Sequence, residues 1–187
     1  MKKRFFDLFL VLLATTVLIL PILLVALLVC FTSKGPVLYW SDRVGRNNKL
    51  FKMPKFRSMQ VDTPAVATHL LENPTQFLTP VGSFLRRSSL DELPQLWSIL
   101  NGDMSFIGPR PALFNQHDLI ALRNQNGVDK LLPGLTGWAQ VNGRDDLPIT
   151  QKVQLDLWYL NNQNFLMDLK ILLLTFVKVL RRDGVTH

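Results

Sequence analysis

An apolar run close to the start of the chain, residues 5–31, constrains the fold more than any other feature. Only Asp7 and the threonines Thr15 and Thr16 interrupt it. As a helix, the run is long enough to cross a hydrocarbon core that is about 30 Å thick. Pro21 lies near its middle, where the ring removes one intrahelical hydrogen bond and collides with the carbonyl four residues earlier. We therefore expect a membrane helix that breaks at Pro21, with the Thr15 or Thr16 hydroxyl as a partner for the backbone groups left free.

Basic residues flank the apolar run at both ends, whereas positive charge ordinarily marks only one side of a span. They are Lys2, Lys3 and Arg4 before the run and Lys34, Arg43 and Arg46 after it. This distribution leaves two topologies open: a kinked span, and a re-entrant hairpin that returns to the leaflet it entered with both ends facing the cytoplasm. A cleaved signal peptide is disfavoured because the run is too long and no small-residue cleavage site follows Cys30.

The composition narrows the possible partners. Apolar residues make up 48% of the chain, which excludes a disordered protein. Twenty-one lysines and arginines against 14 acidic residues give a net charge of +7, which favours nucleic acid, anionic lipid or a phosphorylated substrate. The sequence carries no nucleic-acid recognition signature, so we expect no nucleic acid partner. The single cysteine, Cys30, excludes a disulfide within the chain and favours a reduced, cytoplasm-facing body.

The remaining chain is long enough for one domain, so we divide the 187 residues into a membrane segment, 1–34, and a cytoplasmic domain, 35–187. Turn signals and apolar runs predict a hairpin with strands over 37–40 and 50–53, followed by a surface loop over 62–80 that holds one helical turn. Apolar spacing predicts helices over 81–87, 92–100, 112–125, 150–162 and 165–182. The fold class is therefore mixed α/β and mainly helical, and the apolar but charged last helix is expected to lie in the membrane interface.

Two adjacent carboxylates, Asp91 and Glu92, follow a pair of arginines in the segment 86–95. Pro94 favours a helix that begins near these acids, because proline is tolerated in the first helical turn. A helix N-terminus stabilises carboxylates and attracts phosphate, so the segment predicts a metal and phosphate site. Adjacent acids diverge by roughly 100° around a helix, so that one can attack while the other holds the metal. The structural alternative is a capping box formed by Ser89 and Glu92.

Two further segments carry basic residues in ordered settings. Arg110 stands between Pro109 and Pro111, whose stiff turn would hold its guanidinium for bidentate binding of a phosphate or carboxylate. The alternative is a rigid turn with an incidental arginine. Lys55 and Arg57 alternate with apolar residues and would share one face of a strand, a pattern that also describes an ordinary solvated face.

A glycine-rich stretch, residues 133–144, holds an aromatic ring, an amide and a terminal arginine: Trp138, Gln140 and Arg144, the last directly after Gly143. This set could cradle a nucleotide, although one glycine-rich loop is weak evidence by itself.

Taken together, these segments resemble the bacterial sugar transferase family, the monotopic phosphoglycosyl transferases that begin glycan assembly on a polyprenol phosphate. The resemblance extends over essentially the whole chain and rests on ordered motifs at residues 3–7, 55–59, 89–95, 102–111, 133–140 and 156–159. It implies a re-entrant helix broken at Pro21 and a place on the cytoplasmic face of the bacterial inner membrane, in contact with its lipid. One departure is Leu20, because the family often has serine before this proline, so the hydroxyl that serves the free carbonyls must come from elsewhere.

The resemblance also implies a mechanism. Asp91 would be the nucleophile that attacks the sugar-linked phosphorus of a UDP-sugar, releases UMP and keeps the phosphosugar on its carboxylate. Glu92 would hold Mg²⁺, and polyprenol (undecaprenyl) phosphate would take the phosphosugar in a second step. The alternatives are a direct single displacement and a non-catalytic membrane adaptor.

By the same resemblance, further residues would bind the substrates. Lys55, Arg86, Arg110 and Pro111 would serve the phosphates, Trp138, Gln140, Gly143 and Arg144 the uridine end, and Asp168 would be an acidic partner. Small members of the family often take acetamido sugars, including diacetamido-trideoxy hexoses, which sets our expectation for the donor. A homodimer is possible, but no motif requires one.

Overall fold

The computed structural model describes residues 2–64, 66, 73–143 and 147–181. The α-helices are α1 (Lys2–Thr32), α2 (Gly82–Arg87), α3 (Leu96–Asn101), α4 (His117–Gln125), α5 (Trp138–Val141), α6 (Ile149–Asn162) and α7 (Phe165–Arg181). The strands are β1 (Leu38–Val44), β2 (Leu50–Phe56), β3 (Ser105–Ile107), β4 (Ala112–Leu113) and β5 (Gly134–Thr136). Short 3₁₀ helices are η1 (Arg46–Asn48), η3 (Pro74–Phe77), η4 (Leu90–Gln95) and η5 (Val128–Lys130). The predicted mixed α/β, mainly helical class is confirmed.

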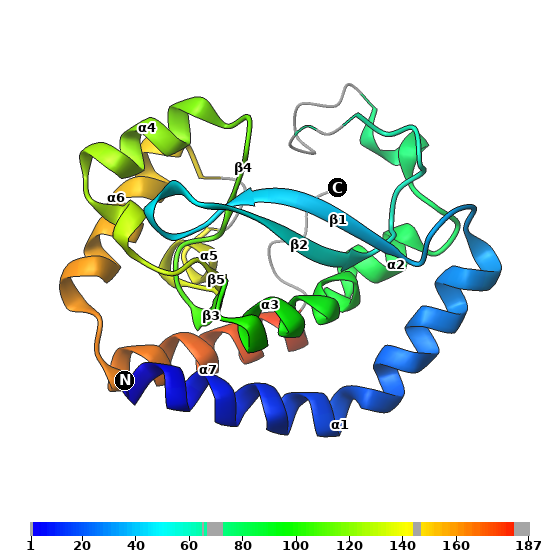
Figure 1. Ribbon diagram of the computed structural model, residues 1–187, viewed down its shortest axis with the longest axis horizontal. Coiled ribbons are helices and arrows are strands. Elements are labelled where there is room, and N and C mark those ends of the chain that lie inside the picture. The colour runs from blue at the N-terminus through cyan, green and yellow to red at the C-terminus, as the bar shows by residue number, and fades with distance from the viewer. Residues whose placement is uncertain (1, 65, 67–72, 144–146, 182–187) are drawn as a thin grey trace.

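The elements form a layered body above the long first helix (Figure 1). Helix α1 runs along the lower edge of the view with α3 and α7 beside it, and the β1–β2 hairpin crosses the middle. The larger sheet has the strand order β2-β1-β4, and the smaller sheet pairs β3 with β5 in parallel. The hairpin agrees with the sequence prediction, and its turn places Asn47 and Asn48 at positive φ, which asparagine tolerates well.

Helix α1 is continuous over 31 residues with Pro21 inside it, and Figure 1 shows that it changes direction partway along. Proline accounts for such a bend because it removes a hydrogen bond and crowds the preceding turn. The Thr16 hydroxyl donates to the carbonyl of Leu12 at 2.9 Å, so it does not serve the Val17 carbonyl that the proline leaves free. For Thr16 the sequence prediction was wrong, because a helical threonine bonds back to its own turn.

The surface of α1 remains largely apolar and exposed. By length and composition the helix could cross a membrane, and only 11% of its most apolar window is buried inside the protein. Large side chains such as Phe5, Phe9 and Phe31 are exposed, and α7 adds Leu166 and Leu173. A continuous apolar surface of this kind needs a lipid or protein covering.

Both halves of α1 pack on the same body. Val11, in the first half, belongs to the main core beneath β3 and α3. Val25 and Val29, in the second half, pack with Phe56 of β2 and Leu85 of α2 in a separate cluster. The helix therefore lies along the domain rather than leaving it at one end.

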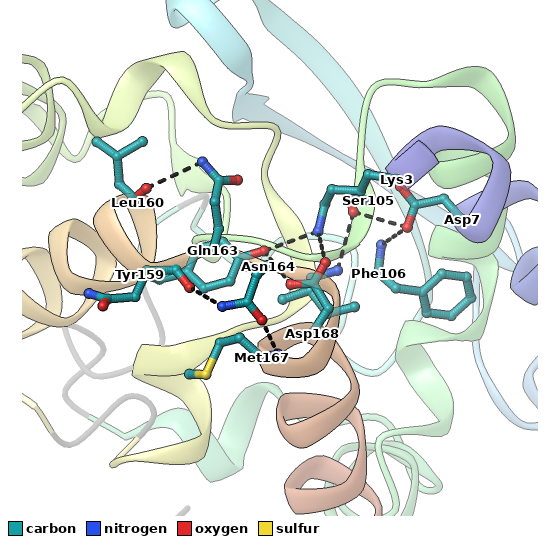
Figure 2. A network of polar contacts seen from close by, with 12 residues as sticks. Lys3, Asp7, Ser105, Phe106, Tyr159, Leu160, Gln163, Asn164, Met167 and Asp168 are labelled. Atoms are coloured by element: carbon teal, nitrogen blue, oxygen red, sulfur yellow. Dashed lines mark hydrogen bonds and ion pairs between the residues drawn. The ribbon is translucent and has the colours of Figure 1, made fainter. Parts of the chain in front are cut away.

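Polar contacts fix the first turns of α1 to the domain. The buried Asp7 carboxylate accepts hydrogen bonds from the Ser105 hydroxyl and the Phe106 backbone N–H, both at 3.0 Å (Figure 2). The Arg4 guanidinium donates to two backbone carbonyls at the end of α3. These contacts set the register of an otherwise apolar helix on the domain.

Two helix predictions were wrong at their starts. The segment predicted as a helix over 112–125 begins as strand β4, whose two residues pair with Arg43 and Val44 of β1 before α4 begins at His117. The segment predicted as a helix over 92–100 is η4 followed by α3. Apolar spacing does not distinguish a buried two-residue strand from a helical turn, because both place apolar side chains inside.

Glycines allow two loops to pack backbone against backbone behind the site. A Cβ atom on Gly108 would lie 2.2 Å from the carbonyl oxygen of Leu132, and one on Gly137 would lie 2.1 Å from the carbonyl oxygen of Gly108. Backbone atoms cannot move aside as a flexible side chain can. The spacing of these glycines in the sequence therefore reflects the close approach of the 108–111 and 133–137 loops.

We predict that Gly108→Ala destabilises the fold by about 2–3 kcal/mol, because the added methyl group overlaps fixed backbone atoms. The measurement is the thermal unfolding midpoint in lipid nanodiscs. The matched control is Gly127→Asn, because Gly127 has φ +69° and its Cβ would meet only the Lys130 amine at 3.9 Å. Asparagine adopts this backbone conformation readily. Equal midpoints for the two variants would contradict the prediction.

Candidate active site

The two adjacent carboxylates lie in η4, a tight turn between α2 and α3. Ser89 precedes the turn in the left-handed conformation, φ 57°, and its side chain makes no capping hydrogen bond to the described residues. The capping box is therefore not formed. Asp91 is buried, and Glu92 points to a cluster of basic side chains from other elements.

Glu92 is held by two cations. One of its oxygens accepts hydrogen bonds from the Lys55 amine at 2.9 Å and from the Arg110 guanidinium at 3.0 Å. Lys55 comes from β2 and Arg110 from the loop between β3 and β4, so three residues predicted from separate segments meet at one point. The side chains of Lys55 and Glu92 are only 15% and 13% exposed. Their attraction is stronger for this burial, because it excludes water.

Burial dominates the electrostatics of Asp91. It raises the pKa of this carboxyl above its ordinary value, the charge on Lys55 opposes that shift, and the neighbouring Glu92 adds to it. Burial also lowers the pKa of Lys55, against the attraction of Glu92 and Asp91. A desolvated carboxylate beside cations is a typical setting for a nucleophile or a general base.

The loop that carries Arg110 is rigid. The Pro109 carbonyl accepts a hydrogen bond from the backbone N–H of Gly134 at 2.9 Å, and the Pro111 carbonyl accepts one from the Arg43 guanidinium at 3.1 Å. Pro111 thus contributes its backbone to the loop, while the Arg110 side chain projects to Glu92. The loop is therefore held by its main-chain carbonyls as well as by the restricted φ of the two prolines.

A cavity of about 520 Å³ opens beside Glu92. Its charged lining residues are Glu92, Arg110, Arg87 and Lys178, and the rest of the lining is largely apolar, with Leu18 from α1 and Phe176 from α7. Glu92 and Arg110 therefore border a space that is also lined by the two most apolar helices. Such a cavity suits a ligand with an anionic head and an apolar body.

The predicted uridine-binding residues fall into separate groups. Gln140 and Gly143 line the cavity, whereas Arg144 lies outside the described residues. The Trp138 ring stacks on Trp158 with centroids 4.9 Å apart, and the Lys170 amine lies 5.5 Å from the Trp138 centroid. These contacts place Trp138 in a packing cluster of α5, α6 and α7.

Asp168 lies in a different network, at the start of α7. Its carboxylate accepts hydrogen bonds from the Lys3 amine and the Tyr159 hydroxyl, both at 2.7 Å, and Lys3 also donates to Tyr159 at 3.0 Å (Figure 2). Burial raises the pKa of Tyr159, so the phenol stays protonated as a donor. The structure thus links Asp168 to the beginning of α1 rather than to the Asp91 cluster.

Of the two arginines at the end of α2, sequence reasoning selected only Arg86. The Arg86 guanidinium contacts the Met59 sulfur at 3.7 Å. Burial raises the pKa of Asp91, and the charge of Arg86 acts in the opposite direction. Arg87, which lines the cavity, was missed. Consecutive residues of a helix point about 100° apart. The sequence therefore indicated that Arg86 and Arg87 would contact different groups, and that each should be considered separately.

The residues at the site can be compared with the ligands that Mg²⁺ requires. Among the described residues, no group of three histidine, cysteine, aspartate or glutamate side chains could hold a metal ion by itself. Mg²⁺ does not require such a group, because it keeps several waters and binds through one or two carboxylates together with substrate phosphates. Glu92, at the edge of the cavity, fits that requirement, with Asp91 adjacent in the chain.

Fold and site define a protein with an exposed apolar helix and a cluster of carboxylates and cations beside a largely apolar cavity. The model of the family described as "Bacterial sugar transferase" matches residues 1–182, and the chain belongs to this family.

Similar proteins carry names that agree with the family. The uncharacterized sugar transferase EpsL of Bacillus subtilis is 39% identical, with 98% of this chain and 89% of the relative covered. The undecaprenyl-phosphate galactose phosphotransferase of Salmonella typhimurium is 41% identical, with 80% of this chain but 34% of the relative covered. The UDP-glucose:undecaprenyl-phosphate glucose-1-phosphate transferase of Escherichia coli is 41% identical, with 90% and 38% covered. The chain thus spans little more than a third of these two longer relatives.

We predict that Asp91→Asn stabilises the protein at pH 7.5 in the absence of substrate and divalent metal. The raised pKa of Asp91 means that its ionised form costs stability above that pKa. This cost vanishes as the pH falls toward the ordinary value of 3.8. The unfolding midpoint should rise by about 2–4 °C for each kcal/mol recovered, with a gain that shrinks on acidification.

The control is Asp42→Asn, which changes an exposed carboxylate paired with Lys52 and should shift the midpoint little. A lower midpoint for Asp91→Asn at pH 7.5 would show that its attraction to Lys55 outweighs its burial.

Proposed function

We propose that this protein transfers a phosphosugar from a UDP-sugar to polyprenol phosphate and releases UMP, through a covalent intermediate on Asp91. The observation that carries the proposal is the position of Asp91 and Glu92 beside Lys55 and Arg110, where Glu92 and Arg110 line a cavity walled in part by α1 and α7. The names of the two longer relatives support the same reaction, since both refer to undecaprenyl phosphate and one refers to UDP-glucose.

The first step forms one bond and breaks one. A carboxylate oxygen of Asp91 attacks the phosphorus next to the sugar, and the bond from that phosphorus to the oxygen of the departing UMP breaks. UMP leaves with the bonding electrons, so an acyl phosphate remains on Asp91. In the second step an oxygen of the lipid phosphate attacks the same phosphorus, and the Asp91 carboxylate is regenerated.

Basic residues reduce the repulsion between an anionic nucleophile and an anionic diphosphate. Arg110 and Lys55 already neutralise Glu92, and they lie where the phosphates of a bound donor would add negative charge. Glu92 would hold Mg²⁺, which when bound supplies further positive charge to the diphosphate. The burial of Asp91 removes the water that would otherwise solvate and weaken the nucleophile.

The cavity suits the lipid acceptor. Its lining offers Arg87 and Arg110 to a phosphate, and its apolar walls offer α1 and α7 to the first isoprene units. The apolar walls offer a nucleotide few polar partners, so we propose that the donor binds at the polar residues of the lining, among them Gln140 and Gly143.

We also propose that α1 is re-entrant and that the protein is monotopic, on the cytoplasmic face of the bacterial inner membrane. A straight helix of this length would extend about 45 Å, so a spanning α1 would carry its far end to the opposite side of the bilayer. Asp7 in the first turns and Val29 near the end both contact one body. Those two contacts, together with the bend of α1 (Figure 1) and the presence of Pro21 within it, support a helix whose two ends share one face.

The test of the reaction is UMP release from a panel of UDP-sugars, acetamido and diacetamido sugars included, by protein in nanodiscs with Mg²⁺ and polyprenol phosphate. We expect release with at least one sugar, and Asp91→Asn should reduce it by about 10³-fold or more because the nucleophile is lost. Asp42→Asn is the matched control and should retain full activity.

Two outcomes would contradict this proposal. Unchanged turnover in Asp91→Asn would favour a membrane adaptor with a contaminating activity. UMP release that strictly requires the lipid, with no phosphosugar on Asp91 by mass spectrometry, would favour direct displacement.

The test of the topology first removes the single native thiol, which is exposed on α1 and would otherwise react. In a Cys30→Ala background, Lys2→Cys and Lys34→Cys should both react with an impermeant maleimide applied to the cytoplasmic side of inverted vesicles. Reaction of either cysteine only from the opposite side would show that α1 spans the membrane.

A further inference from the structure

A buried ion pair behind the site joins α4 to α6. The Arg123 guanidinium donates to one oxygen of the Asp156 carboxylate through Nη2 at 2.7 Å and Nε at 3.1 Å. The two side chains are only 12% and 2% exposed. Neither residue contributes to the reaction as described above.

The same guanidinium has a second target. Its Nη1 donates to the backbone carbonyl of Arg110 at 2.8 Å. Arginine can make all these bonds at once because its donors form a rigid planar fork. Asp156 therefore aims Arg123, and Arg123 holds the peptide of Arg110 in place.

The Arg110 residue is thus fixed on both sides. The Arg110 carbonyl accepts a hydrogen bond from Arg123, and the Arg110 guanidinium donates one to Glu92 at 3.0 Å. The same loop is stiffened by hydrogen bonds to the carbonyls of Pro109 and Pro111, the second donated by the Arg43 side chain. A small change in the Arg110 peptide would move the guanidinium at the end of its side chain away from a bound phosphate.

Stability alone does not explain a pair of this kind. Burial raises the pKa of Asp156 against the opposing charge of Arg123, which shows the cost of placing this carboxylate away from water. Apolar residues of similar volume are often as stabilising as a buried ion pair. The pair offers what apolar residues lack, a directed donor for the Arg110 carbonyl.

We propose that Arg123 and Asp156 are positioning residues for phosphosugar transfer, which hold the Arg110 guanidinium on the substrate phosphate through the Arg110 backbone. This inference rests on the proposed function and extends it to two side chains outside the catalytic cluster. Asp156 belongs to the 156–159 motif, so the inference also gives that segment a role in the reaction.

The test is a double-mutant cycle of Arg123→Lys and Arg110→Ala, measured as kcat for UMP release per folded molecule. Lysine keeps the charge but not the fork, and a misplacement of about 1 Å can cost about 100-fold in rate. We expect Arg123→Lys to lower kcat by about 100-fold and to cost little more in the Arg110→Ala background. Asp156→Asn should behave in the same way. Lys52→Ala, which breaks an exposed ion pair, is the control and should change nothing.

A second cycle on the same variants measures the affinity for UDP with Mg²⁺ by calorimetry, and it does not depend on turnover. The positioning role would be overturned if the effects of Arg123→Lys and Arg110→Ala multiplied in both the kcat cycle and the UDP-affinity cycle. It would also be overturned if the fraction of unfolded protein explained the defect of Arg123→Lys. Absence of UMP release by the unmodified protein would instead contradict the proposed function, while non-additive losses in UDP binding would still support the positioning of Arg110.

Discussion

The burial of Asp7, the one acidic residue of the largely apolar helix α1, determines how this helix fits against the rest of the protein. Asp7 has two donors on β3, so helix α1 can settle in only one register without leaving a buried carboxyl and two donors unpaired. That register places Val11 in the main core and Leu18 beside the cavity. The hydrogen bonds of Asp7 therefore decide which α1 side chains line the proposed acceptor site, since apolar contacts alone would allow the helix several registers.

At the site, opposite charges partly offset the cost of burying ionisable side chains. Asp91, Glu92 and Lys55 are all largely buried, which is costly for each of them separately. Their arrangement reduces the cost without removing it, because the pKa of Asp91 remains raised and that of Lys55 remains lowered. A bound diphosphate would meet cations that are already ordered, so little reorganisation is required when the substrate enters.

The parts of this fold that were predictable from sequence are those with a periodic signal or a turn signal. The hairpin was indicated by its turn residues, and α6 and α7 by their apolar spacing. The short strands β3 and β5 escaped prediction because three residues carry no usable period, and β4 was absorbed into a helix for the same reason. The Asp91 and Glu92 pair, Lys55 and Arg110 were selected from three separate segments, and the resemblance to a family joined them. The Arg123–Asp156 pair carries no local signal, since its two members lie 33 residues apart and meet only in the fold.

The apolar base formed by α1 and α7 has a consequence for the bilayer itself. In the proposed placement these helices occupy one leaflet and leave the other untouched, so the protein acts as a wedge that expands the cytoplasmic leaflet alone. Its insertion then depends on lateral pressure and on lipid shape in that leaflet, with conical lipids relieving the packing stress around the wedge. Membrane curvature and lipid composition thereby become determinants of where such a protein settles, independently of any substrate.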